Sequence, residues 1–154
     1  MTDTIRTEFW KALEHSPFIM VNLTGDHVHS LPMTAQLDRD ANHAFWFYTT
    51  RDNRLAKGGA AMAQFSAKGH DLFACISGTL REEIDPSIID RYWSNQVEAW
   101  YEGGRNDPNL LMLRFDLDDA EIWTMEMGVK GLFKLMTGKK INPQEAGQHA
   151  QVAL

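Results

Sequence analysis

Residues 44–50 read Ala-Phe-Trp-Phe-Tyr-Thr-Thr and form the most β-like stretch of this 154-residue chain. Aromatic and β-branched side chains fit the pleated surface of a sheet, so the stretch predicts a strand. Successive side chains of a strand point to opposite faces, and Trp46 is therefore expected to face away from Phe45 and Phe47.

The neighbouring segments also read as strands separated by short turns. Phe18–Leu23 is rich in β-forming residues and ends at the turn Thr24-Gly25-Asp26. His27–Leu37 is a second candidate, and Pro32 within it predicts an edge strand or a bulge, because proline cannot donate to the ladder. Short turns favour an antiparallel sheet, so the pattern predicts a mainly β fold, a small barrel with attached helices. Further strands are predicted at 60–67, 71–80, 110–115 and 120–125, the first two as a hairpin turning at 68–70.

Helical spacing of apolar residues marks the remaining elements. The pattern of residues 5–13 predicts an N-terminal helix ended by Ser16-Pro17. Asp85 as N-cap and Pro86 in the first turn predict a longer helix, whose apolar stripe continues to Trp100. Shorter helical segments are predicted at 51–57, ended by Gly58-Gly59, and at 129–136, followed by a flexible polar tail at 139–154.

Composition and charge narrow the class of protein. The length predicts a single domain over residues 1–154, with no repeat or linker. The 21 acidic and 15 basic residues give a net charge of −6, which argues against a nucleic-acid partner. The single cysteine, Cys75, sits in an apolar run and reads as a small buried hydrophobe of a reducing compartment. The polar N-terminus does not look like a signal peptide, and no apolar run reaches the length of a membrane span. We therefore expect a cytoplasmic protein without a membrane partner.

Few residues carry recognisable chemistry. Phosphate-loop, dinucleotide-binding, nucleophile-elbow and paired-cysteine zinc motifs are missing from the sequence. His27 and His29 alternate along a predicted strand and could begin a metal site, but no third ligand can be placed, so we predict no metal. The segment 49–54 combines hydroxyls, an amide and guanidiniums at a strand-to-helix junction. Such a segment either binds an anion or simply caps the helix.

Here the chain resembles a known family. Phe47-Tyr48-Thr49, followed by Asn53-Arg54, is similar to the Phe-Tyr-Thr…Ser-Arg-Lys stretch of pyridoxamine 5′-phosphate oxidases, and Glu121-Ile122-Trp123 resembles their Glu-Phe-Trp. The general stress protein branch of this superfamily matches more closely, over about residues 9–138. The motifs that recur there, in this order, are Pro32-Met33, Trp46-Phe47, Ile76-Ser77-Gly78, Trp100-Tyr101-Glu102-Gly103-Gly104, Asp107-Pro108 and Ala120-Glu121-Ile122-Trp123.

The resemblance implies a six-stranded antiparallel split barrel of the FMN-binding type, which dimerises and holds two flavins at the interface. By position, Tyr48 and Thr49 would contact FMN, and Arg54 its phosphate. The strand Pro32-Met33-Thr34-Ala35 would run beside the isoalloxazine ring, and Trp123 would reach the flavin of the partner subunit. The other residues assigned to cofactor binding are Thr50, Arg51, Asn53 and Lys57.

The departures from the family pattern also carry information. Leu31 stands where the family has Arg, Asn53 replaces Ser, and Leu55 stands at the Lys of the oxidases. Arg51 or Lys57 would have to replace the lost charges. The chain after Trp123 lacks the Arg-x-His pair that clamps the vitamin phosphate, so we do not expect pyridoxamine phosphate oxidase activity.

Three functions follow from these observations. The leading one is a flavin-dependent oxidoreductase with NADH or NADPH as electron donor, in which the flavin carries out the transfer and the protein binds and tunes it. No side chain is assigned as catalytic acid or base. The second is a non-catalytic protein that sequesters flavin during stress. The third is that the lost charges have abolished FMN binding or shifted it to FAD.

Overall fold

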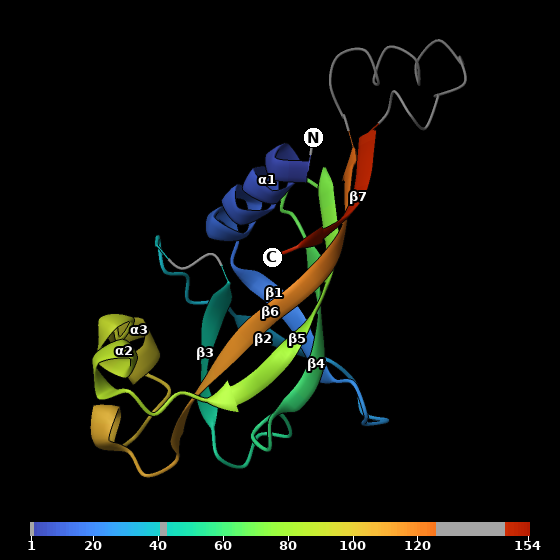
Figure 1. Cartoon of the computed structure of the whole chain (residues 1–154). Helices are drawn as coiled ribbons and strands as arrows, with labels where there is room; N and C mark the ends of the chain where they lie inside the picture. The colour runs from blue at the N-terminus through green and yellow to red at the C-terminus, as the bar shows by residue number, and fades with distance from the viewer. Residues whose placement is uncertain (1, 41–42, 126–146) are drawn as a thin grey trace.

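The computed structural model describes residues 2–40, 43–125 and 147–154 and shows an antiparallel sheet with a few helices (Figure 1). The strand order is β2-β1-β4-β5-β6-β3, and β7 pairs with the free edge of β6. In chain order the elements are α1 (Thr2–His15), β1 (Phe18–Leu23), β2 (Leu31–Thr34), β3 (Ala44–Thr50), β4 (Gly59–Ser66), β5 (Leu72–Glu82), α2 (Pro86–Arg91), α3 (Asn95–Glu98), the 3₁₀ turn η1 (Gly104–Asn106), β6 (Leu110–Met125) and β7 (Gly147–Ala153).

One bridge closes this sheet into a barrel. The amide N–H of Gln36 donates to the carbonyl of Trp46 at 2.7 Å, and the N–H of Trp46 donates back at 3.0 Å. This bridge joins the chain just after β2 to β3, so the two ends of the strand order meet. The prediction that Pro32 lies in an edge strand is confirmed, because β2 stands at one end of the order and its ladder runs only along β1.

The core fills the barrel from the inward faces of the strands. Phe45 and Phe47 are fully buried in it, whereas Trp46 points outward into a second, smaller apolar cluster with Ala44 and Met112. The opposite facing of Trp46, predicted from strand alternation, is therefore confirmed. The N-terminal helix is confirmed as α1, which buries its apolar stripe in the main core, and each such large side chain contributes roughly 1.5–3 kcal/mol of burial.

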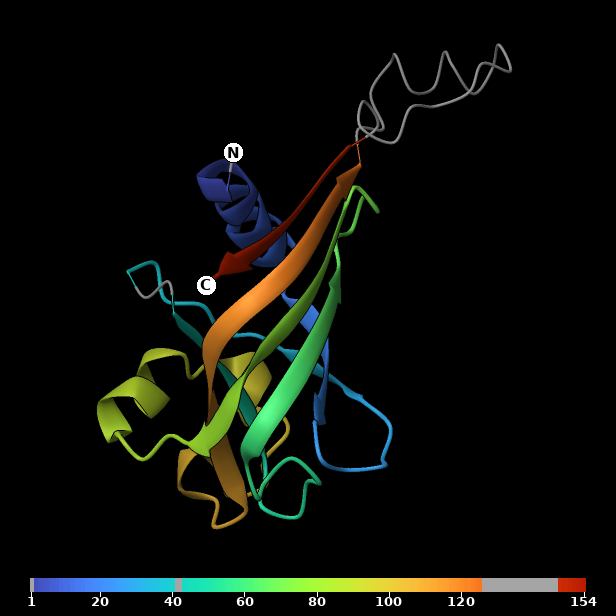
Figure 2. The ribbon, with the colours of Figure 1, turned by 45° about the vertical axis from the view of Figure 1, so that its right-hand side comes forward.

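β6 was predicted as two strands and is one strand of sixteen residues. Figures 1 and 2 show it running along the molecule, with α2 and α3 beside one half and β7 beside the other. The acidic residue that interrupts its apolar pattern, Asp116, pairs with Arg81 of β5 at 2.7 Å and with Arg114 at 2.6 Å. A register shift at Ser77/Gly78 of β5 leaves Asp118 of β6 without a partner in this ladder, which continues on both sides of it.

Two helix predictions need correction. Residues 51–57 form successive turns instead of a helix, because the Asn53 side chain accepts from the N–H of Leu55 at 2.8 Å and competes with helical hydrogen bonds. The helix that Asp85 caps ends at Arg91, and a new one starts where Ser94 accepts from the N–H of Val97. The stripe predicted to run to Trp100 thus belongs to two short helices.

The prediction of a flexible tail at 139–154 is wrong for the last residues. Gly147–Ala153 forms β7, and Val152 and Leu154 are buried in the core. These apolar side chains and the free edge of β6 together stabilise a strand that its polar composition did not suggest. β7 is a seventh strand beyond the six predicted. The helix predicted at 129–136 and residues 139–146 lie outside the described residues.

Within the described ranges, no helix is both long and apolar enough to cross a membrane.

Candidate functional site

The barrel brings two of the predicted cofactor-binding segments to one seam. We use this name for the place where residues 31–34 of β2 face residues 48–50 of β3. The Gln36–Trp46 bridge joins the chain just after β2 to β3 in antiparallel orientation, and β2 and β3 approach each other beside it. No ladder joins the two strands there among the described residues, so the seam is the split of the barrel.

The β2 side of the seam offers a ligand backbone groups and two small side chains. Pro32 and Thr34 are exposed and point outward, whereas Met33 and Ala35 are buried and point into the core. β2 uses its other edge to pair with β1, so the edge that faces β3 has peptide groups available for hydrogen bonding. Met33 and Ala35 can therefore contribute to a site only through their backbones.

The β3 side is held rigidly by two tyrosines. The hydroxyl of Tyr48 donates to the carbonyl of Ile89 in α2 at 2.5 Å, and its ring packs edge-on against Trp93. The hydroxyl of Tyr101 donates to the carbonyl of Thr49 at 2.6 Å. Burial raises the pKa of Tyr48 and raises that of Tyr101 to about 12, so both phenols stay neutral donors. Because the Tyr48 hydroxyl is already engaged, its ring and backbone remain for a ligand.

The turn after β3 carries the cations assigned to phosphate binding, and they differ in availability. Arg51 is paired with Glu82 at 3.0 Å, and Lys57 with Asp26 at 2.9 Å. Arg54 is exposed and has no ion pair among the described residues. An incoming phosphate would therefore meet the Arg54 guanidinium without displacing a carboxylate.

The other polar residues of this turn hold its conformation. The Thr50 hydroxyl donates to the Asp52 carboxylate at 2.5 Å, and Asn53 caps the turn as described above. Leu55, which stands at the position of a lysine in the oxidases, is 2% exposed and belongs to the core. The lost charge at this position is thus replaced by an apolar side chain that anchors the turn to the barrel.

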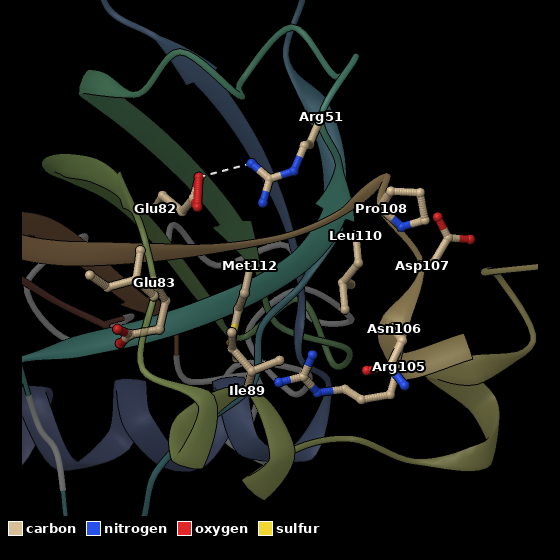
Figure 3. A pocket seen from close by; sticks show the side chains of 11 residues that line it. Arg51, Glu82, Glu83, Ile89, Arg105, Asn106, Asp107, Pro108, Leu110 and Met112 are labelled. Carbon is tan, nitrogen blue, oxygen red and sulfur yellow. Dashed lines mark hydrogen bonds and ion pairs between the residues drawn. The ribbon is translucent and has the colours of Figure 1, made fainter. Parts of the chain in front are cut away.

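A pocket of about 320 Å³ lies beside the seam, between the end of β5, the start of β6 and η1 (Figure 3). Arg51 is the one predicted site residue in its lining. Both guanidiniums in the pocket lining already form ion pairs, Arg51 with Glu82 and Arg105 with Asp90 at 2.5 Å. Three carboxylates also line the pocket, so its charge does not favour binding of a phosphate. The lining residues, which sequence reasoning missed apart from Arg51 and the Asp107-Pro108 motif, are Arg51, Glu82, Glu83, Ile84, Ile89, Arg105, Asn106, Asp107, Pro108, Leu110 and Met112.

Trp123 lies far from the seam of its own chain. It is near the C-terminal end of β6, whereas Thr50 of the seam pairs with Leu110 at the start of the same strand. Yet it faces the same way as the seam residues. Register connects Pro32, Met20, Gln64, Cys75 and Glu121 across five strands, and the adjacent row contains Thr34, Phe18, Phe73 and Trp123. We call these nine residues the outer face.

Three large apolar side chains of the outer face are exposed to solvent. Phe18 is 63% exposed, Met20 is 40% exposed and Trp123 is 37% exposed. Cys75, interpreted as a small buried hydrophobe, is only partly buried and lies in the middle of this face. Its alternation with the inward-pointing Ala74 and Ile76 places it outside the core.

The histidine pair is not on a strand. His27 and His29 lie in the exposed segment before β2, which starts at Leu31. Within the part of the chain that the structure describes, no three potential metal ligands come together.

The fold and the seam define the class of protein: the chain is an antiparallel split barrel, the architecture of FMN-binding split-barrel proteins. The model of a family described as pyridoxamine 5′-phosphate oxidase like matches residues 4–145, and the chain belongs to this family. Its structural relatives place it in the general stress protein branch. No protein of curated function matches the chain in sequence.

Three solved structures illustrate the relationship. A protein of Xanthomonas citri, described as a general stress FMN/FAD binding protein, is 47% identical, with a TM-score of 0.76 over 83% of this chain and 94% of that one. A candidate general stress family protein of Xanthomonas campestris pv. campestris is 44% identical, with a TM-score of 0.76 over 84% and 92% of the two chains. A candidate general stress protein 26 of Jannaschia sp. CCS1 is 30% identical and covers both chains completely, with a TM-score of 0.84.

Proposed function

We propose that this protein binds a flavin, FMN or FAD, at the seam, and that a second copy of the chain completes the site. The observation that carries the proposal is that a free β2 edge lies beside the end of β3, and that the turn after β3 carries Arg54, which has no ion pair among the described residues. The name of the X. citri protein, which is 47% identical, supports a flavin as the ligand.

The residues present fit the chemistry of a flavin. Peptide groups along the free edge of β2 suit the polar rim of an isoalloxazine ring, and the Tyr48 ring supplies aromatic contact. The exposed guanidinium of Arg54 suits a phosphate, since charge-assisted hydrogen bonds to phosphate are strong. Thr49 and Thr50 contribute backbone at the same end of β3, and Arg51, Asn53 and Lys57 hold the turn that carries Arg54.

The outer face supports a homodimer. In a twofold dimer the same surface meets itself, so a residue at one end of the face meets the residues at the other end of the second copy. The seam and Trp123 stand at opposite ends of the outer face, with Phe18, Met20 and Phe73 between them. Such packing would bury exposed apolar area and bring Trp123 of one copy to the flavin of the other.

For the reaction, we propose an oxidoreductase that takes electrons from NADH or NADPH in the cytoplasm. A bound flavin supplies the hydride or electron transfer, and this chain's residues bind and orient it. The neutral phenols of Tyr48 and Tyr101, the first partly and the second fully buried, keep the β3 side of the site in one conformation. The alternative is a protein that sequesters flavin, in which the second copy would cover the reactive face of the ring.

The test is the visible absorption spectrum of the purified protein, recorded before and after loading with FMN or FAD and gel filtration. We expect a retained flavin band that NADH or NADPH bleaches under anaerobic conditions. A retained band that neither nucleotide bleaches would favour sequestration. Folded protein that retains neither flavin would overturn the proposal.

A further inference from the structure

Trp123 is paired with a histidine that the sequence analysis did not single out. His149 of β7 lies directly opposite Trp123 of β6, and the two rings stack with centroids 5.1 Å apart and planes inclined by 12°. Directly opposed side chains of an antiparallel pair are close enough to stabilise each other. The stack covers one face of the indole.

A carboxylate holds the imidazole in place. The Nε2 of His149 is 2.7 Å from Oε1 of Glu121, which is two residues before Trp123 on the same face of β6. The three side chains thus form a connected cluster in which Glu121 fixes the imidazole and the imidazole lies against the indole.

The backbone under this cluster is anchored on both sides. Towards the C-terminus, Val152 and Leu154 are buried in the core, and the N–H of Leu154 donates to the carbonyl of Asp118. Towards the other end of β7, the N–H of Gln148 donates to the Thr124 hydroxyl at 3.0 Å. His149 therefore sits on a strand whose register with β6 is fixed.

All three side chains remain partly exposed. The relative exposure is 37% for Trp123 and about half for the side chains of His149 and Glu121. The structure therefore leaves part of the indole available while it restricts the ring's rotation. This is the arrangement that a contact residue on a docking face needs, since ordering a loose side chain on binding weakens affinity.

We propose that His149 is a positioning residue that fixes the Trp123 ring for contact with the flavin bound at the seam of a second copy. The inference rests on the proposed function and extends it to β7. His149 acts through the indole and is not assigned a contact with the flavin itself. Loss of the stack would free the side-chain torsions of Trp123, with an expected cost of about 2- to 10-fold in flavin affinity.

The experiment compares four full-length variants in two measurements, the dissociation constant for FMN and the fluorescence lifetime of the bound flavin. A nearby indole quenches flavin fluorescence by electron transfer, so the lifetime reports how the ring is placed. The variants are Trp123→Leu, His149→Ala, His149→Phe and, as a control on the same strand, Gln151→Ala. The far-ultraviolet circular dichroism of each variant checks that the fold is retained.

We expect Trp123→Leu to lengthen the lifetime and weaken binding, and His149→Ala to shift both measurements in the same direction. His149→Phe keeps an aromatic ring for the stack and should stay close to the wild type, as should Gln151→Ala. A wild-type result for His149→Ala, with Trp123→Leu altered, would overturn the inference while leaving the proposed function intact. A wild-type result for Trp123→Leu would overturn both the inference and the placement of Trp123 at the flavin.

Discussion

The indole Nε1 of Trp46 donates a 2.9 Å hydrogen bond to Oε1 of Glu83, and both side chains are almost completely buried, with exposures of 2% and 6%. Trp46 lies in β3, and Glu83 directly follows β5, so the contact spans the strand between them, β6. The guanidinium of Arg114 in β6 lies 5.4 Å from the centroid of the Trp46 ring and 4.0 Å from the Glu83 carboxylate. These three side chains tie the outer side of the barrel to the start of α2.

Removing the donor should therefore destabilise the protein. Trp46→Phe leaves the buried Glu83 carboxylate without its indole partner, and we expect a loss of about 1–3 kcal/mol in the free energy of unfolding. Chemical denaturation measures this loss. The matched control is Trp100→Phe, because Trp100 is 84% exposed and its truncation should change stability by less than about 0.5 kcal/mol. Equal effects of the two substitutions would contradict the role of the hydrogen bond.

Gly78 marks the point where β5 approaches β6 too closely for a side chain. A Cβ at this position would collide with the carbonyl oxygen of Asp116 and lie 2.8 Å from a ring carbon of Phe115. Gly78→Ala should therefore cost about 1–3 kcal/mol of stability. Gly25→Ala is the control, since nothing lies within 4 Å of its added methyl group. Thermal or chemical denaturation of both variants makes the comparison, and a neutral Gly78→Ala would contradict the close approach.

The three tyrosines should ionise at a higher pH in the folded protein than in the unfolded chain. Burial raises the pKa of Tyr48, Tyr92 and Tyr101, the last to about 12, because it penalises the charged phenolate. Folding favours the neutral phenol, so this stability is fully present below the unfolded pKa of about 10 and is lost as the pH rises towards 12. Ultraviolet titration of the native protein should show little phenolate at pH values where the urea-unfolded chain is half ionised. Coincident titration curves would show that the phenols are not protected.

Arg54 is the cation expected to bind the flavin phosphate. Arg54→Ala should weaken FMN binding by about 10- to 100-fold, the loss expected for charge-assisted hydrogen bonds. Lys57→Ala is the matched control, because Lys57 is already paired with Asp26 and should change affinity much less. Flavin titration followed by absorbance measures both constants. If Lys57→Ala weakened binding more than Arg54→Ala, the phosphate assignment would be wrong.

The outer face can be tested by adding a charge. Met20→Glu places a carboxylate between the seam and Phe73, and burying it without a partner would disfavour the proposed dimer. Sizing chromatography should show a shift towards the monomer mass of 17.5 kDa. Val28→Glu is the control, since Val28 is also exposed but lies in the segment before β2. A wild-type chain that elutes as a monomer would rule out the shared site, whereas an unchanged dimer in Met20→Glu would place the interface elsewhere.

Local patterns accounted for much of the fold. Residues 44–50 were predicted as the strand that became β3, and Pro32 was predicted in an edge strand. The N-terminal helix and the cap at Asp85 also follow from nearby residues alone. For β6 and β7, where the prediction was wrong, a distant partner was the cause. Asp116 reads as a strand end until Arg81, far away in sequence, neutralises it within the ladder.

The candidate site, too, could be predicted from the sequence only in part. The segment from Thr49 to Arg54 stood out in the sequence as an anion-binding candidate, but the sequence could not show which cations form ion pairs. The structure shows Arg51 and Lys57 already paired with carboxylates. The placement of Trp123 and its stack on His149 depended on β7, whose polar sequence was read as a tail.

The elements that could be predicted from the sequence are those whose stability depends on neighbours a few residues apart: alternating aromatic strands, an amphipathic helix and its caps. The seam between β2 and β3, the ion pairs of Arg51 and Lys57 and the His149–Trp123 stack became visible only in the folded chain. The physical reason is that register, ion pairing and burial are properties of two segments in contact. Neither segment alone encodes the geometry at which they meet.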